Sequence, residues 1–325
     1  MKKVLRPLAS VAMALAALVP QARAGTVDYP DRMVRIVVPY PAGGATDVAL
    51  RMVAERLGAA WHQPIVVENR PGASGRTGLM TVAKSPASYT FVAATNSTIC
   101  DELLHPGDDS VQLMRDLAPV GMVFSTPVVL VVNKSMNVST LAQYEREARR
   151  HPGTVSFGSS GLGTSTHFYG ELLRRASGIE ITHVPYAGEG PNANDLLGGH
   201  ISSAFLSAFG AKKLDRTGTV RMLAVTTPAR SPLLPGVASF TELGVKGLDR
   251  DSWVGLFAPA ATPMEVREKV ADAIRRIAAQ PDVRERLAAL GLVAEGSTPQ
   301  ELDRRMQADR AYWAKAIQVT GIRLE

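Results

Sequence analysis

Two glycine-rich segments of this chain have the residue types needed to hold an anion. The first, residues 34–47, reads VRIVVPYPAGGATD, and the second, residues 154–167, reads TVSFGSSGLGTSTH. Each combines a short β-type apolar run, a glycine-rich turn, Ser, Thr or Asp capping groups, and the start of an amphipathic helix. The first N–H groups of a helix lack intrahelical partners, and the helix dipole favours negative charge there. Two such turns predict two lobes that present two helix ends to one small acid.

The second turn also allows catalytic interpretations. Ser159 or Ser160 could pair with His167 as in a hydrolase, but the G-x-S-x-G spacing is absent because the second glycine comes one position early. Residues 158–165 also resemble a phosphate-binding loop, yet Thr164 stands where the phosphate-gripping lysine is required. We therefore favour turn donors with a capping or pocket imidazole, and keep a serine hydrolase that uses Ser160 and His167 as the alternative.

Composition argues against a nucleic-acid or metal-binding protein. The chain has 36 basic and 30 acidic residues, but four basic residues and no acid lie in residues 1–24, which leaves 32 against 30. That balance, with no basic cluster interleaved with aromatic residues, predicts no nucleic-acid partner. The six histidines show neither H-x-x-x-H nor carboxylate–histidine spacing, so we predict no metal site and no cofactor.

Residues 1–24 have the pattern of a secretory signal peptide. The basic start is followed by residues 8–19, which are apolar but too short to span a bilayer, and residues 22–24 fit an A-x-A cleavage site. An uncleaved membrane anchor is the less favoured alternative. We expect cleavage before Gly25 and a soluble protein in a bacterial periplasm. The one cysteine, Cys100, excludes an internal disulfide, so the domain must be stable through its core alone.

Strand-like and helix-like runs alternate along the chain, which predicts an α/β protein with largely parallel sheets. A mature chain of roughly 300 residues favours two lobes over one core. The runs 128–133 and 253–259 are expected to cross between lobes, which gives one lobe from residues 25–127 plus 254–325 and another from residues 128–253. The expected strands are residues 34–39, 64–69, 89–94, 128–133, 155–158, 201–206, 221–227 and 253–259.

Further motifs accompany the two turns in a fixed order: VVENRPGASGRTG lies between the turns, and the second turn is followed by HVPYAGEG with DLLGGHI, SWVGLFAPAATP and the terminal WAKAIQVTGIRLE. This order resembles the Bug-type (TctC-like) extracytoplasmic solute receptors of tripartite tricarboxylate transport systems. The resemblance implies a two-lobe, type II-like Venus-flytrap periplasmic-binding fold without catalytic residues or an obligatory metal. It implies a dicarboxylate, tricarboxylate, acidic amino acid or aromatic acid as ligand, and integral-membrane transporter subunits as partners. We expect a monomer.

The resemblance also implies which residues bind the ligand. Glycines let the backbone approach closely, and Ser, Thr and amide groups supply donors without a buried counter-charge. Asp47 cannot attract a carboxylate, so we expect it to cap the helix, anchor a bridging water, or receive a hydroxyl or ammonium group of the ligand. The first lobe would contribute Tyr40, Pro41, Ala42, Gly43, Gly44 and Asp47, and the second Ser159, Ser160, Gly161, Gly163, Thr164, His167 and Tyr186.

Residues 95–113 depart from the pattern of this family. Its members commonly have a Gly-Thr-rich loop and an Asn-Pro-x-Leu-Tyr element here, whereas this chain reads TNSTICDELLHPGDDSVQL. We still expect Thr95, Asn96 and Ser97 to line the cleft. Two further interpretations stay open: a receptor that presents its ligand-closed state to a signalling protein, and a scaffold that has lost its ligand.

Overall fold

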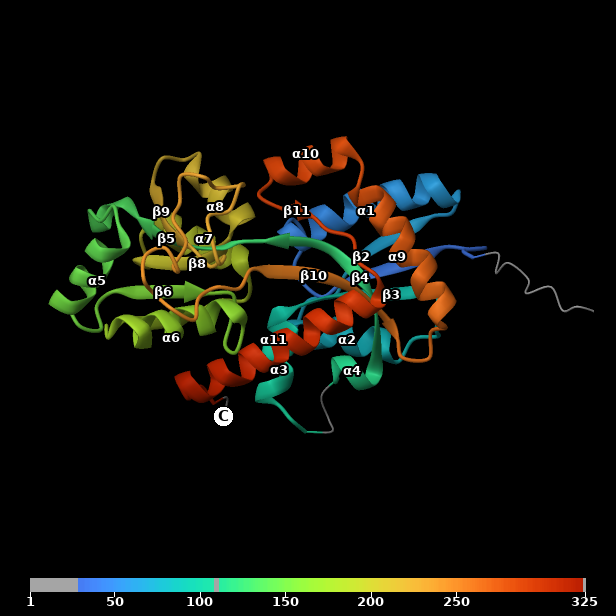
Figure 1. Cartoon of the computed structure of the whole chain (residues 1–325), viewed down its shortest axis with the longest axis horizontal. Coiled ribbons are helices and arrows are strands. Elements are labelled where there is room, and N and C mark those ends of the chain that lie inside the picture. The colour runs from blue at the N-terminus through green and yellow to red at the C-terminus, as the bar shows by residue number, and fades with distance from the viewer. Residues whose placement is uncertain (1–28, 108–110, 324–325) are drawn as a thin grey trace, which may run out of the picture.

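The computed structural model describes residues 29–107 and 111–323, which form two β-sheets covered by helices (Figure 1). The α/β class is as predicted, but the expectation of largely parallel sheets is wrong. Both sheets are mixed, because β10 and β4 in one sheet and β5 in the other pair antiparallel with their neighbours. The expected signal peptide, residues 1–24, lies outside the described residues. The six-stranded sheet has the order β11 (Val293–Ala294), β4 (Leu117–Thr126), β10 (Ser252–Pro259), β3 (Thr90–Thr95), β1 (Val34–Val38) and β2 (Ile65–Asn69). The five-stranded sheet has the order β7 (Thr182–Pro185), β6 (Ser156–Ser159), β8 (Ser203–Ser207), β5 (Val128–Asn133) and β9 (Val220–Val225).

All eight expected strands are present, and β4, β7 and β11 are strands that the sequence did not indicate. The longest of these, β4, contains Pro119 and Gly121, which interrupt a strand-like pattern. Its pairing with β10 is irregular, with register shifts between Val254 and Gly255 and between Leu256 and Phe257. Such irregularities let a strand contain residues that a regular ladder disfavours.

The chain passes between the two sheets at two places. β4 ends at Thr126 in the six-stranded sheet and β5 begins at Val128 in the five-stranded sheet, so Pro127 forms the first passage. The second passage is the segment 226–251, between β9 and β10. Each passage directly precedes a strand that was expected to cross, and β5 and β10 then each belong to one sheet only.

Helices cover both sheets, and α11 (Pro299–Thr320) extends from β4 and α3 to α6 (Figure 1). On the six-stranded sheet the other helices are α1 (Ala45–Trp61), the 3-10 turn η1 (Ala73–Gly75), α2 (Arg76–Ala83), α3 (Asn96–Leu104), α4 (Leu113–Asp116), α9 (Met264–Ala278) and α10 (Pro281–Ala289). On the five-stranded sheet they are η2 (Lys134–Met136), α5 (Leu141–Arg150), α6 (Ser165–Ser177), α7 (Glu189–Gly198) and α8 (Ala208–Asp215).

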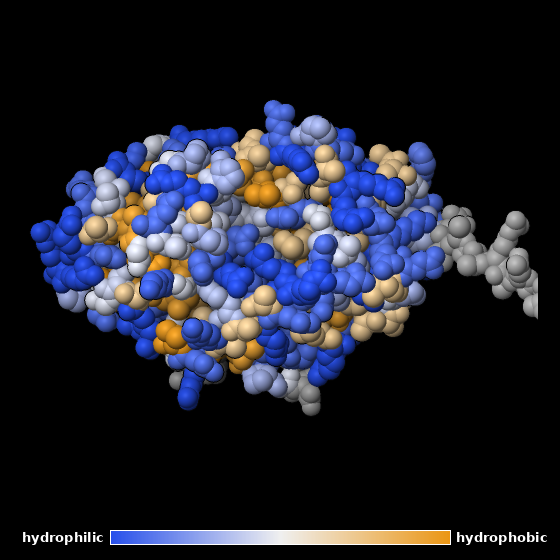
Figure 2. Space-filling model, in the orientation of Figure 1, coloured by the Kyte–Doolittle hydropathy of each residue, from blue (hydrophilic) through white to orange (hydrophobic). Residues whose placement is uncertain are grey.

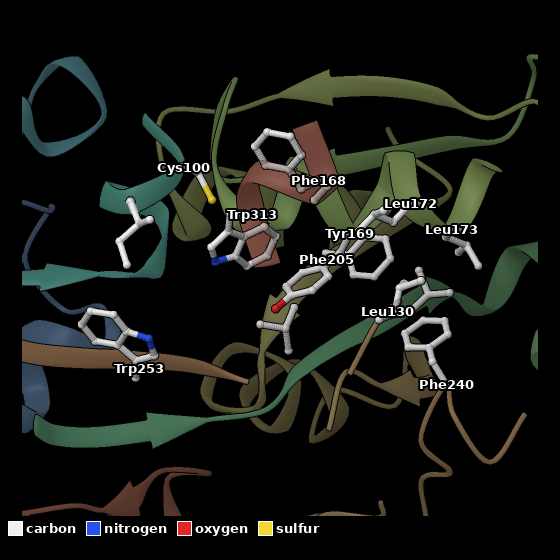
Figure 3. Packing of buried hydrophobic residues seen from close by; sticks show 14 of the residues in the cluster. Cys100, Leu130, Phe168, Tyr169, Leu172, Leu173, Phe205, Phe240, Trp253 and Trp313 are labelled. Atoms are coloured by element: carbon white, nitrogen blue, oxygen red, sulfur yellow. The ribbon is translucent and has the colours of Figure 1, made fainter. Parts of the chain in front are cut away.

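An aromatic core joins α11 to α6 (Figure 3). Trp313 of α11 is fully buried, and its ring centre lies 5.4 Å from that of Tyr169 on α6. Tyr169 lies 6.1 Å from Phe205 of β8, which extends the contact into the five-stranded sheet. The same cluster contains Val92 of β3 in the other sheet. One hydrophobic core therefore runs through both lobes.

The surface in Figure 2 is mainly hydrophilic, with apolar residues in small separate areas. Exposed large apolar side chains are spread over distant elements, for example Leu162 in the second turn and Leu243 in the second passage. Apolar residues scattered singly are normal on a protein surface. None of the helices within the described residues is long and apolar enough to cross a membrane.

Candidate functional site

The first glycine-rich turn leaves the start of α1 open. Gly44 is the N-cap residue and offers no side chain to cap the helix. Gly43 has a left-handed φ of +82°, and its N–H donates to Asp47 Oδ2 at 2.9 Å. Within the described residues, no acceptor lies within hydrogen-bonding distance of the N–H groups of Ala45 and Thr46. These two amides are therefore available to an anion.

Asp47 holds this turn in place. Its Oδ1 accepts hydrogen bonds from Arg51 Nε at 2.9 Å and from Asn69 Nδ2 at 3.1 Å. Burial acts to raise the pKa of Asp47, but the hydrogen bonds from Arg51, Gly43 and Asn69 outweigh burial and lower the pKa below its usual value. The carboxylate is thus ionised and paired with Arg51, which removes most of its repulsion toward an anionic ligand. Of the roles open to Asp47, clamping the turn is the one that its contacts support.

The second turn repeats this design. Thr164 is the N-cap residue of α6 and makes no capping hydrogen bond with its side chain. Gly163, with φ of +71°, donates its N–H to His167 Nδ1 at 3.2 Å. The spacing of four residues is the same as between Gly43 and Asp47. Since Nδ1 accepts, the neutral ring of His167 is assigned the tautomer with its proton on Nε2.

Behind the second turn lies a stack of aromatic rings. The His167 and His183 ring centres are 3.9 Å apart and nearly parallel, and Phe157 stacks on His183 at 4.9 Å. His183 Nε2 forms a hydrogen bond of 2.7 Å with Ser159 Oγ. Burial lowers the pKa of His167 to about 4; burial and the neighbouring His167 lower the pKa of His183 to about 3. Both rings are therefore neutral at neutral pH, and this wall is polar without being charged.

A chain of hydroxyl groups joins the two turns. Tyr40 Oη lies 3.1 Å from Thr95 Oγ1, which also accepts a hydrogen bond from Ser97 N at 3.1 Å. Ser97 Oγ lies 3.0 Å from Ser165 Oγ and accepts the Ser165 N–H at 3.1 Å. The N-terminal ends of α1, α3 and α6 thus converge, with α3 and α6 in direct contact. The arrangement can hold an anion between the two lobes.

Comparison with known proteins identifies the family. The sequence profile of the "Tripartite tricarboxylate transporter family receptor" family matches residues 49–322. The chain belongs to this family. It is 31% identical to BugT of Bordetella pertussis over 91% of this chain and 92% of that protein. It is 33% identical to a UPF0065 protein of Agrobacterium vitis over 94% of this chain and 89% of that protein.

Solved structures agree with this assignment. R. palustris Rpa4515, solved with adipate, has a TM-score of 0.86 at 33% identity and covers 91% of this chain and 99% of its own. The periplasmic binding protein BugD has a TM-score of 0.83 at 27% identity and covers 91% of this chain and all of its own. The chain is thus a solute-binding receptor with a two-lobe periplasmic-binding fold, and the family places it in the periplasm. The resemblance seen in the sequence is confirmed.

Not every predicted site residue of the receptor points toward the joined turns. Asn96 is fully buried; its Nδ2 donates to Asp251 O at 3.4 Å and its Oδ1 accepts from Ser252 Oγ at 3.0 Å. It therefore ties α3 to the end of the second passage. Tyr186 donates its N–H to Ser159 O at 3.1 Å and its hydroxyl to Asp195 at 2.7 Å, beside the second turn. Pro41, Ala42 and Gly43 are exposed, whereas Ser160, Gly161 and Gly44 are partly exposed.

The hydrogen bonds of the serines and histidines in the second turn argue against the hydrolase interpretation. The serine that pairs with a histidine is Ser159, with His183, and Ser159 is fully buried with its Oγ also bonded to Gly161 O at 3.1 Å. Ser160 donates its N–H to Thr166 Oγ1, and His167 Nδ1 is occupied by Gly163. Ser159 is therefore too buried to act as a nucleophile, and within the described residues no hydrogen bond joins the Ser160 hydroxyl to a histidine that could activate it.

Sequence reasoning missed two residues of this region, Ser165 and Ser74. Ser74 follows Ala73, and both have left-handed φ values, of 56° and 46°. A Cβ on the adjacent Gly75 would lie 3.6 Å from the Tyr40 ring, so this strained turn packs behind the first glycine-rich turn. Strain of this kind persists where the surroundings enforce it, often at ligand sites. The motif RPGASG was the available signal.

Two surface hollows, of about 460 and 500 Å³, lie elsewhere. The first is next to α4 and Arg310, and the second lies between α5 and residues 243–246. In the described part of the chain no group of three His, Cys, Asp or Glu side chains is placed to hold a metal ion.

Proposed function

We propose that this receptor binds one small organic carboxylate between its two glycine-rich turns and delivers it to the integral-membrane subunits of a tripartite tricarboxylate transporter. The observation that carries the proposal is the convergence of two helix starts through the hydrogen bonds of Ser97 and Ser165. Within the described residues, the N–H groups of Ala45–Thr46 on α1 and of Thr166–His167 on α6 make no hydrogen bond. Backbone amides and neutral side chains suit a carboxylate. Related structures contain such ligands, adipate in Rpa4515 and malate in MatC.

The proposed contacts follow from this placement. The open amides of α1 and α6 take the carboxylate, His167 Nε2–H is a further donor, and Ser97 closes the site from α3. The ligand belongs to the dicarboxylates, tricarboxylates, acidic amino acids or aromatic acids. The full proposed set is Tyr40, Pro41, Ala42, Gly43, Gly44, Asp47, Thr95, Ser97, Ser159, Ser160, Gly161, Gly163, Thr164, His167 and Tyr186. Asn96 is not part of it, because its buried amide bonds Asp251 and Ser252.

Binding works by population shift between an open and a closed form. A ligand that contacts both helix ends stabilises the closed form by its differential affinity for that form. We assign one lobe to residues 25–127 plus 254–325 and the other to residues 128–253, because the change of sheet at Pro127 supports the first boundary. We further propose export by cleavage of residues 1–24, action as a monomer, and no catalysis.

A thermal-shift screen tests the proposal. The purified receptor, unfolded and refolded to remove carried ligand, is screened against dicarboxylates, citrate-like acids, acidic amino acids and aromatic acids. We expect one class to raise the melting temperature by several degrees, since ligand binding stabilises the folded state by mass action. No shift with any carboxylate in a refolded, cooperatively unfolding sample contradicts the proposal. Labelling by a serine-directed fluorophosphonate would contradict the absence of catalysis.

A further inference from the structure

Glu189 is a carboxylate without a cation next to the second turn. It begins α7, and it accepts hydrogen bonds from Ser207 N at 2.7 Å and from Ser207 Oγ at 2.8 Å. Among the described residues, no Lys, Arg or His nitrogen forms an ion pair with it within 4 Å. The acid of the first turn, Asp47, is by contrast paired with Arg51 at 2.9 Å. One lobe therefore has an acid paired with a cation, whereas the acid of the other lobe is held only by hydrogen bonds from Ser207 at the start of α8.

Strand direction places Glu189 at the ligand edge of its sheet. β6 pairs in parallel with both β7 and β8, so the three strands end at the same edge. β6 leads into the second turn, β7 into Tyr186 and Glu189, and β8 into Ser207. The Tyr186 N–H bonds Ser159 O, and a Cβ on Gly161 would lie 3.3 Å from Tyr186 O. Ligands of α/β sheets bind outside the carboxyl ends of parallel strands.

Glu189 is partly exposed and lies close to the passage between the two sheets. It keeps partial contact with solvent, yet burial is the largest influence on its pKa and raises it, against the lowering effect of the Ser207 hydrogen bonds. Its partner Ser207 pairs with Val128, and Ala208 N donates to Pro127 O at 2.8 Å. Glu189 is thus held beside the first passage between the lobes.

We propose that Glu189 selects the ligand by accepting a hydrogen bond from a hydroxyl or ammonium group and by disfavouring a further carboxylate at that position. This inference rests on the proposed function, because it requires a carboxylate held between the two turns. Each carboxylate oxygen of Glu189 accepts one hydrogen bond from Ser207 and can accept another. A ligand carboxylate beside it would meet a like charge that no cation neutralises. The favoured ligands are hydroxy and amino acids with two carboxylates.

Calorimetric titration with two series of acids tests this selection; within each series the acids share one carbon skeleton and differ in a hydroxyl or ammonium group. The purified receptor and Glu189→Gln are titrated with succinate, malate and aspartate, with glutarate, 2-hydroxyglutarate and glutamate, and with tricarballylate. In each series, the hydroxy acid and the amino acid carry a hydrogen-bond donor that the unsubstituted diacid lacks. We expect the unaltered receptor to bind the tighter-binding of these two acids at least tenfold more tightly than the unsubstituted diacid. Glu189→Gln should reduce that ratio at least tenfold and strengthen tricarballylate relative to the unsubstituted diacid.

Glu147→Gln is the matched control, because Glu147 is an acid on α5 that pairs with His151 away from the turns. It should leave all ratios unchanged. If Glu189→Gln does not fold, Glu189→Asp keeps the charge but withdraws it by one methylene, and it must weaken the donor-bearing acid more than the unsubstituted one. An unchanged ratio in a folded Glu189 variant overturns this inference and leaves the proposed function standing. Failure of every acid to bind the unaltered receptor instead contradicts the proposed function.

Discussion

The side-chain hydroxyl groups of Ser97 and Ser165 lie 3.0 Å apart, and the Ser165 N–H donates to Ser97 Oγ at 3.1 Å. Ser97 belongs to the first turn of α3 in one lobe, and Ser165 is the first residue of α6 in the other. The contact joins one lobe to the other and lies between the two open helix ends. We expect it to belong to the closed form and to break when the lobes open.

Replacing Ser97 with alanine should weaken ligand binding by favouring the open form. A neutral hydrogen bond contributes about 0.5–1.5 kcal/mol, so we expect roughly a twofold to tenfold loss of affinity. Titration calorimetry measures the affinity, and small-angle scattering measures how far the ligand-free protein opens. Ser135→Ala, at an exposed serine of η2, is the control and should change neither quantity. Equal affinity in Ser97→Ala and the unaltered receptor would show that this contact does not contribute to closure.

The Gly44→Asp substitution should abolish carboxylate binding without unfolding the receptor. Gly44 has φ of −77° and ψ of 169°, which any residue adopts, and a Cβ there would meet only Pro41 O, at 3.8 Å. Asp caps helices well, so the melting temperature should be unchanged or higher, while its charge occupies the anion position. Gly44→Asn caps equally well without the charge and should lose less affinity. Equal binding by both variants would mean that the ligand does not contact the start of α1.

Asp47 should make the folded state sensitive to acid. Because its pKa is lowered in the folded state, the unfolded chain binds the proton more readily, and the stability from Asp47 is present above the unfolded pKa. That stability is lost as pH falls through the folded-state value. Urea unfolding at a series of acidic pH values should show a smaller loss in Asp47→Asn, which also lacks the ionic clamp to Arg51. Parallel curves for the two proteins would contradict this role.

The stacked histidines should destabilise the receptor between neutral and mildly acidic pH. Their folded-state pKa values of about 4 and about 3 lie below the ordinary 6.5, so the unfolded chain takes up protons first as pH falls. The contribution of the two neutral rings to the free energy of unfolding is therefore fully present above pH 6.5. Below that pH it decreases by at most about 1.4 kcal/mol per pH unit for each ring. His183→Gln should flatten the dependence of the melting temperature on pH.

Replacing Gly170 of α6 with alanine should destabilise the receptor, because the added methyl group has no room. A Cβ at Gly170 would lie 1.9 Å from the Phe157 ring, so Gly170→Ala should cost about 1–3 kcal/mol of the free energy of unfolding. Gly190→Ala on α7 is the matched control: nothing lies within 4 Å of its added Cβ, and alanine favours a helix by about 0.5–1 kcal/mol. Chemical denaturation measures both. A neutral Gly170→Ala would contradict the close packing of Phe157 against the helix.

Much of each turn could be predicted from its own residues. The succession of strand, glycine-rich turn and helix at 34–47 and 154–167 is local, because the bonds from Gly43 to Asp47 and from Gly163 to His167 span four residues. β4 was not predicted, because Pro119 and Gly121 weaken a local strand pattern that only pairing with β10 restores. Local sequence does not reveal which distant strand will pair with it.

The sequence by itself determined the α/β class, the two turns and the chemistry of neutral donors at two helix starts. Tertiary structure alone decided which of these groups meet: Ser97 with Ser165, 68 residues apart, and Ser159 with His183 rather than Ser160 with His167. It also turned Asn96 toward the second passage and left Glu189 without a cation. The physical reason is the distance along the sequence between the contacting residues. Capping and turn geometry depend on neighbours within one helical turn, whereas these contacts depend on strand order and on how the two lobes close.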